Sequence, residues 1–275
     1  MNIASGDTVL AHQVATLTRL LLISSNYIDN YCEMGPAGSL SAHARTENLR
    51  LRADRYGRLR FHPSSIPFIA LTSLSYGGTL GQQTTYTGVQ SFVEDGRTVI
   101  IDAQPSNTGW AGPLQFGALS PSRELLTTVS YTAGYVNTLL AADATAGASM
   151  LPVLDATGIQ PSQALRVFDP PAGDETIQVT GTYVPSTGPT TLPLTTGLVN
   201  PHVTANPVRV SAMPDDVTQA CIFYTIAMLM RPESTAESAF PDMKGLDTRI
   251  ADSRRDGSGL VFEVSHLLEP YRRII

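Results

Sequence analysis

Residues that could do chemistry are present in this chain, but their spacing matches no catalytic pattern. The clearest paired carboxylates are Asp215 and Asp216, which directly follow Met213-Pro214. Such a pair can act as general acid and base. Two Asp residues after a Pro also fit the first turn of a helix, where they complement the partial positive charge of its N-terminus. Capping explains the pair completely, so we expect no catalytic role for it.

The other candidate ligands and nucleophiles are scattered. Cys32 and Cys221 stand in apolar stretches without CxxC spacing, so we expect buried free thiols. The histidines have no ligand spacing, and we expect surface or capping positions for His12, His43, His62, His202 and His266. The sequence also lacks a P-loop, a GxGxxG turn and an HExxH helix. It therefore predicts a protein that is not an enzyme and binds no cofactor and no metal.

Arginines form one regular pattern. In residues 48–61, apolar and Arg residues alternate on both sides of an Asp-Arg-Tyr-Gly turn. This alternation predicts a hairpin with one apolar face and one basic strand face, the latter formed by Arg50, Arg52, Arg58 and Arg60. The basic face is solvated, or contacts an acidic protein neighbour, or contacts DNA. The net charge of −6 argues against a general nucleic-acid binder.

Segments of three kinds carry these residues. Apolar residues at helical spacing predict an N-terminal helix over residues 5–30, and a long apolar helix after Pro214 that is buried on most faces. Residues 48–131 predict a small antiparallel β region. Between residues 136 and 210, short apolar runs separated by Gly and Pro turns predict an all-β barrel or sandwich of roughly 70 residues.

Composition and the N-terminal sequence indicate which kind of protein this is. Of 275 residues, 42% are hydrophobic and only 15% are charged, which allows a packed core and under-charged helices. The apolar run Leu20–Ile23 is too short for a signal peptide or a membrane span. We expect a protein made in a cytoplasm, with no membrane partner.

Short motifs in a particular order carry a resemblance to a known family. After the first helix come a proline-marked strand, Ile66-Pro67-Phe68-Ile69, and a strand end, Thr127–Tyr135 (TTVSYTAGY). A helix start follows at Met213–Ala220 (MPDDVTQA), and the chain closes on Leu267–Arg272 (LLEPYR). This order resembles the head-to-tail connector (adaptor) proteins of tailed bacteriophages. In that family a TYTAGY-like strand end runs within a few residues into a vPxDv-like helix start.

The resemblance implies a fold class and domain boundaries. The fold is α+β, with a helical connector core made by residues 1–135 and 211–275 and a C-terminal arm from about residue 232. Residues 136–210 are an inserted β module that usual adaptors lack, similar to modules of various phage virion proteins. We expect Tyr135 and Met213 to lie close together in space, with the module inserted between them.

The resemblance also implies function and partners. Adaptors form a homo-oligomeric ring, commonly of twelve subunits, at the virion neck. The ring lies between the portal protein and a stopper or tail-completion protein, and DNA passes through its lumen without sequence-specific binding. The expected portal-docking arm comprises Leu260, Phe262, Leu267, Leu268, Pro270, Tyr271, Arg272 and Arg273. The expected subunit interface comprises Leu17, Leu20, Leu21, Val217, Tyr224 and Met228. Assembly is expected in the host cytoplasm, in support of viral genome packaging.

Two other functions stay open. One is a different tail or baseplate component whose β module contacts a partner or a host surface. The other is a hydrolase or carbohydrate-binding protein with its ligand in the β module. The latter lacks an aromatic platform, because Phe168 and Tyr183 are the only aromatic residues between positions 136 and 210.

Overall fold

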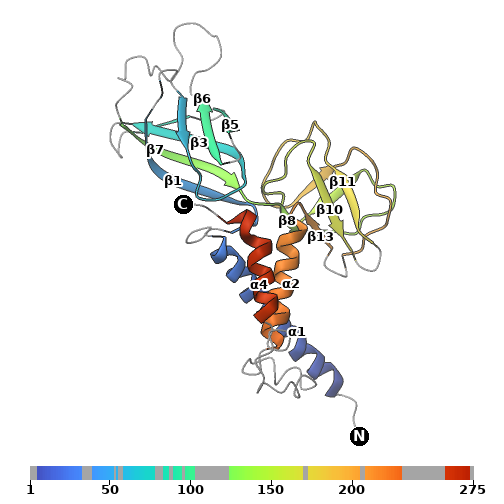
Figure 1. Ribbon diagram of the computed structural model, residues 1–275. Helices are drawn as coiled ribbons and strands as arrows, with labels where there is room; N and C mark the ends of the chain where they lie inside the picture. The colour runs from blue at the N-terminus through green and yellow to red at the C-terminus, as the bar shows by residue number, and fades with distance from the viewer. Residues whose placement is uncertain are drawn as a thin grey trace. The chain divides into compact units, whose positions relative to one another are not determined.

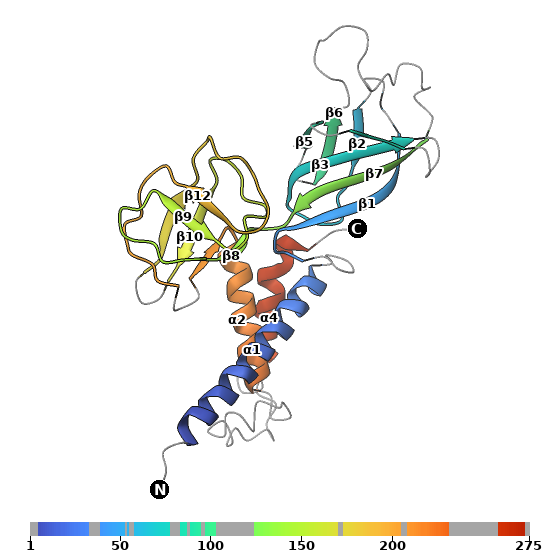
Figure 2. The same ribbon diagram turned by 180° about the vertical axis from the view of Figure 1, so that it is seen from behind.

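A computed structural model of the chain describes most of its residues (Figures 1 and 2). The described residues are 5–32, 39–52, 54, 58–77, 83–86, 89–94, 97–102, 124–169, 173–204, 208–230 and 258–272. The chain divides into two compact parts: a helical unit (residues 1–37 and 213–275) and a β unit (residues 38–212). The predicted grouping of residues 1–135 with 211–275 stays a prediction.

The helical unit contains three α-helices and a short 3-10 turn in its described residues: α1 (Ser5–Tyr31), α2 (Asp215–Met230), α4 (Ser258–Leu268) and η3 (Glu269–Tyr271). Helix α2 packs against both α1 and α4. The internal seam is lined by Leu20, Ser24, Ile28, Val217, Ala220, Thr225, Ala227, Val264 and Leu268. The hydroxyls of Ser24 and Thr225 lie 2.8 Å apart and share one hydrogen bond, and each also lies 2.8 Å from the carbonyl oxygen four residues earlier in its own helix. None of the described helices has the length and hydropathy of a membrane span.

Helix α2 differs from the long apolar helix predicted after Pro214. It has 16 residues, begins with Asp215 and Asp216 as expected, and buries four of its side chains. Ile222 and Ile226, one turn apart, are exposed. Apolar residues therefore lie on both the inner and the outer side of this short helix.

The first part of the β unit is two antiparallel sheets around one core. The first sheet has the order β1-β7-β3-β4 and the second β2-β6-β5. Their bounds are β1 (His43–Arg52), β2 (Arg58–Phe61), β3 (Phe68–Gly77), β4 (Thr84–Tyr86), β5 (Gln90–Glu94), β6 (Thr98–Asp102) and β7 (Glu124–Ala133). Both sheets contribute to the buried cluster of Leu51, Leu59, Phe61, Leu74, Val99, Ile101, Leu125, Val129, Tyr131 and Ala133. We call this part the sandwich.

The predicted hairpin over residues 48–61 is wrong. Strand β1 pairs with β7, so that Arg50 lies opposite Leu126, whereas β2 pairs with β6, so that Arg60 lies opposite Ile100. The alternation was read correctly, because Leu51 and Leu59 both reach the core. They reach it from two different sheets, and an alternating pattern does not specify the partner strand.

The second part of the β unit is a closed six-stranded barrel. Its strands are β8 (Asn137–Leu139), β9 (Met150–Val153), β10 (Ala164–Phe168), β11 (Glu175–Gln178), β12 (Thr190–Pro193) and β13 (Arg209–Ser211). They form sheets of order β11-β10-β13-β8 and β12-β9. Bridges between Leu140 and Val153 and between Val179 and Leu194 join the two sheets at both edges. Closure pairs every strand with two neighbours around one apolar core.

The expected fold class, α+β on a helical connector core, is wrong. The described residues are mostly β, in four sheets, and the helices are confined to the smaller unit. The physical reason lies in residues 43–211, where Val, Thr, Ser and Leu alternate with turn-forming Gly and Pro. That composition favours strands packed face to face over helices.

Candidate functional site

The two motifs that carry the family resemblance directly flank the barrel in the chain. The chain enters the barrel at Val136 after β7 and leaves it at Ala212 before α2. The Ala212 N–H donates to the Val136 carbonyl oxygen at 2.9 Å, and the Ser211 hydroxyl donates to the same oxygen at 3.0 Å. The entry and exit of the barrel are therefore hydrogen-bonded neighbours, and we call this point the joint.

Gly134 fixes the path of the chain just before the joint. Its φ of +104° lies in a region that favours glycine, and its N–H donates to the Pro67 carbonyl at 2.8 Å. A Cβ atom at this position would lie 2.5 Å from the Ser41 carbonyl oxygen. The Tyr135 N–H donates to the Leu40 carbonyl at 2.6 Å. The glycine of TTVSYTAGY is thus required by both backbone conformation and close approach.

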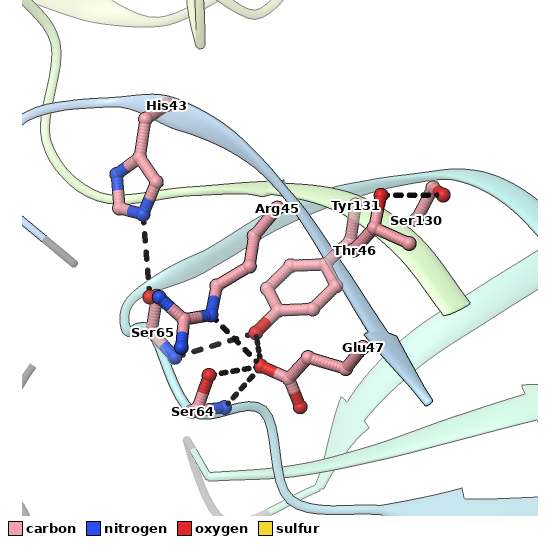
Figure 3. A network of polar contacts seen from close by, with 8 residues as sticks. All are labelled: His43, Arg45, Thr46, Glu47, Ser64, Ser65, Ser130 and Tyr131. Atoms are coloured by element: carbon pink, nitrogen blue, oxygen red, sulfur yellow. Dashed lines mark hydrogen bonds and ion pairs between the residues drawn. The ribbon is translucent and has the colours of Figure 1, made fainter. Parts of the chain in front are cut away.

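A polar network centred on Glu47 lies at the same end of the sandwich (Figure 3). Glu47 Oε1 accepts from the Ser64 N–H at 3.0 Å, from Arg45 Nε at 3.2 Å, and from the hydroxyls of Ser64 and Tyr131. The Tyr131 oxygen in turn accepts from the Ser65 N–H at 3.3 Å. The network ties β1 and β7 to the segment that precedes β3.

The pKa values assign the charge states of this network. Burial alone would raise the pKa of Glu47, but hydrogen bonds from Ser64 and Tyr131 and the charge of Arg45 lower it below its usual value. Burial, and then the hydrogen bond to Glu47, raise the pKa of Tyr131 to about 12. At neutral pH an ionised carboxylate therefore accepts from a protonated phenol, which is a structural clamp rather than an acid–base pair.

His43 and Ser65 come together beside the clamp without forming a usable nucleophile. His43 Nδ1 donates to the Ser41 carbonyl at 2.7 Å, so that in the neutral ring Nε2 accepts from the Ser65 hydroxyl at 3.3 Å. A Ser–His pair can activate a hydroxyl, but the Ser65 side chain is completely buried. No reactant reaches that oxygen, and the pair orients the segment before β3.

A second buried cluster, in the barrel, was missed by the sequence analysis. His202, expected at a surface or capping position, is completely buried. Its Nδ1 lies 3.0 Å from Asp169 Oδ2, and its Nε2 lies 3.4 Å from Glu175 Oε2. His202 is 33 residues from Asp169 and 27 from Glu175 in sequence, so no local spacing signals the cluster.

Glu175 connects this cluster to a loop. Its carboxylate accepts from the N–H groups of Val199 at 2.6 Å and Asn200 at 3.0 Å. Burial would raise the pKa of Glu175, but these two hydrogen bonds and His202 lower it. The cluster holds residues 197–204 against the barrel and, with one imidazole between two carboxylates, lacks a converging metal-ligand set. Among the described residues no group of His, Cys, Asp and Glu could hold a metal ion.

The predicted interface residues divide between the inside and the outside of the helical unit. Leu20 and Val217 are buried in the seam, Tyr224 and Met228 are half-buried, and Leu17 and Leu21 are exposed. The Tyr224 ring stacks on that of Tyr27, with centroids 4.0 Å apart. Only part of the predicted set is therefore available to a second subunit.

The predicted arm residues are also divided. Leu268 is buried, Leu260, Leu267 and Tyr271 are half-buried, and Phe262, Pro270 and Arg272 are exposed. Weak contacts hold the end of the predicted arm on the rest of the helical unit. The Tyr271 hydroxyl lies 3.4 Å from Asp216, and the Arg272 guanidinium lies 5.8 Å from the centre of the Tyr31 ring. Arg273 and the predicted arm start near residue 232 lie outside the described residues.

The four predicted basic residues do not form one strand face. Arg50 and Arg52 lie on β1, 4.0 and 2.8 Å from the two oxygens of Glu124. Arg60 lies on β2 in the other sheet, 3.1 Å from Glu94, and Arg58 is half-buried at the start of that strand. Three of the four thus face carboxylates of the same chain.

Comparisons with known proteins add no relative: no family model, no curated protein and no solved structure matches this chain.

Proposed function

We propose that this chain is a structural, non-enzymatic protein of the virion neck of a tailed bacteriophage. It acts as a head-to-tail adaptor that forms a ring around the DNA channel, between the portal and a stopper or tail-completion protein. The joint carries this proposal. The 2.9 Å hydrogen bond between Val136 and Ala212 leaves TTVSYTAGY and MPDDVTQA consecutive once the barrel is set aside, as the resemblance requires.

Exposed apolar residues on the helices support a ring of copies. Val14, Leu17 and Leu21 recur every three to four residues along α1 and are exposed, and Leu22 beside them is 63% exposed. We call these four residues the α1 stripe. Ile222 and Ile226 form a similar outward pair on α2. A monomer rarely leaves such aligned apolar residues in water, and a second copy would cover them.

The electrostatics support DNA passage without tight binding. Arg50, Arg52 and Arg60 are matched by Glu124 and Glu94, and the chain is net negative. A lumen with few unmatched cations does not retain the DNA backbone. The exposed arm residues, above all Phe262 at 74% exposure, offer a contact for the portal.

Assembly of the purified full-length chain tests the proposal. We expect cryo-electron microscopy to show a closed ring, and the double variant Leu17→Glu/Leu21→Glu to stay monomeric because it places charges on the α1 stripe. Asn26→Glu is the matched control, since this exposed residue lies on another side of α1; it should still form rings. The same particles are then added to purified portal protein.

Other outcomes separate the alternatives. Rings that bind the portal support the adaptor. A trimer that locates to the tail tip of purified virions would instead identify a tail or baseplate component. Equal assembly of the double variant and the control would show that the α1 stripe is not the subunit interface.

A further inference from the structure

The outside of the barrel carries an apolar row with an arginine in it. Strands β10, β13 and β8 lie side by side (Figure 1), and their outward residues line up: Phe168 opposite Arg209, and Arg209 opposite Leu139. The Leu154 N–H donates to the Leu139 carbonyl at 2.9 Å, which extends the row. Phe168 and Leu154 are 48% and 49% exposed. We call these four residues the barrel row.

Arg209 differs from the other arginine on the same sheet face. Arg166 lies one row along, opposite Ser211, and is bonded to the Asp174 carboxylate. For Arg209, no salt bridge to any carboxylate is formed within the described part of the chain. An arginine between an aromatic ring and leucines is a typical composition for the centre of a protein interface. The matching surface must supply a carboxylate beside an apolar side chain.

Strand β5 in the sandwich presents that combination. It forms one edge of the second sheet and pairs only with β6 among the described strands. Phe92 and Glu94 are two residues apart and therefore lie on the same side of β5. Phe92 and Val93 are exposed, and the Glu94 side chain is 40% exposed. The exposed ion pair between Glu94 and Arg60 contributes little to stability, so it does not prevent a second cation from approaching Glu94.

We propose that the barrel row of one copy docks on the β5 edge of a second copy, with Arg209 facing Glu94 and Phe92 packing against Phe168 and Leu139. The residue spacings on the two surfaces are compatible with this contact. Residues opposite one another on neighbouring strands are about 5 Å apart, and residues two apart along a strand are about 6.7 Å apart. Because the barrel is closed, it has no strand edge of its own to add to a partner sheet, and its side must make the contact.

This contact joins two different surfaces, so it is head-to-tail. Such a contact repeats from copy to copy and closes into a ring when the rotation allows. The inference rests on the proposed function, because it names a second contact of the proposed ring beside the α1 stripe. It also assigns a purpose to the inserted barrel: bracing neighbouring subunits.

Matched arginine variants of the full chain test how much Arg209 contributes to assembly. Arg209→Gln and Arg166→Gln remove the same charge from the same sheet face. We expect Arg209→Gln to raise the protein concentration at which half of the chain is assembled, measured by sedimentation velocity, by about tenfold or more. Arg166→Gln should assemble as the wild type does. Equal behaviour of the two variants would overturn the proposal.

Cysteine cross-linking tests the geometry. In a Cys221→Ser background, the double variant Phe92→Cys/Leu139→Cys should give a ladder of covalent oligomers on mild oxidation. Each single variant should give no covalent product larger than a dimer. Wild-type rings that show no ladder in the double variant would reject this contact and leave the adaptor proposal standing. A chain that never forms rings but still gives the ladder would reject the adaptor proposal and keep the contact.

Discussion

At the residue scale, two polar clusters in the described part of the chain tie strands and loops together. The Glu47 carboxylate accepts several hydrogen bonds on one oxygen, and Glu175 accepts two backbone N–H groups while facing His202. Neither cluster could be read from the sequence, since each joins residues from separate strands and loops. The spacing of these residues in the sequence gives no reason to expect either cluster, and only the fold brings them together.

Replacing Glu47 tests the clamp. Glu47→Gln removes a charged acceptor from buried donors and should lower the free energy of unfolding by about 1–3 kcal/mol at pH 7. Because folding lowers the pKa of Glu47 below 4.5, its stabilisation is present above that value. It is lost as the pH falls through the folded-state pKa. In urea unfolding, the difference in stability between wild type and variant should therefore shrink as the pH is lowered from 7.

The exposed Glu124 provides the control for that measurement. It faces Arg50 and Arg52 at the surface, and Glu124→Gln should cost less than about 1 kcal/mol. Equal losses for Glu47→Gln and Glu124→Gln would show that the clamp contributes nothing beyond a surface ion pair.

At the element scale, many strands and the starts of two helices were predictable, and the pairing of the strands was not. The strands between residues 136 and 210 were predicted from short apolar runs separated by Gly and Pro turns, and the helix start at Asp215 from a Pro-Asp-Asp cap. The partner of β1 was not, because any strand with an apolar inner face satisfies the same alternation. Strand β8 was missed altogether, since its three residues are too few to show a period.

Gly134 gives a prediction for the strand end before the joint. Gly134→Ala combines a φ of +104° with a Cβ atom 2.5 Å from the Ser41 oxygen, and should cost about 3–5 kcal/mol. Gly147 has a φ of +81° with nothing within 4 Å, so Gly147→Ala should cost only the backbone strain, about 1–2 kcal/mol. Thermal unfolding compares them, and equal shifts would exclude close approach as the cause.

At the scale of the whole molecule, the sequence predicted an insertion and misjudged what surrounds it. The stretch between residues 136 and 210 was predicted to be a separate β module from its short apolar runs and its Gly and Pro turns. The surroundings were expected to be mainly helical. The predicted N-terminal helix exists, whereas the long apolar helix predicted after Pro214 is wrong and a 16-residue helix stands there. The described residues between 43 and 133 form a sandwich of two sheets with a core of its own, so the larger unit of the fold is β and not helical.

Excising the barrel tests the independence of the two β cores. Joining Val136 to Ala212 through a short Gly-rich link removes the barrel cluster and leaves the sandwich cluster complete. The sandwich should then lose about 1–2 kcal/mol or less, from the contacts of Ala42 and Ile69 with Gly158. Urea unfolding followed by the circular dichroism of the shortened chain measures this. Loss of cooperative unfolding would show that the barrel is integral.

The joint also determines how the chain carries mechanical load. A tension applied between β7 and α2 enters at Val136 and leaves at Ala212, which a hydrogen bond joins directly. The pull reaches the β8–β13 ladder of the barrel only after that bond has opened. The barrel is therefore shielded from stretching, and under internal pressure the joint yields before the barrel strands do.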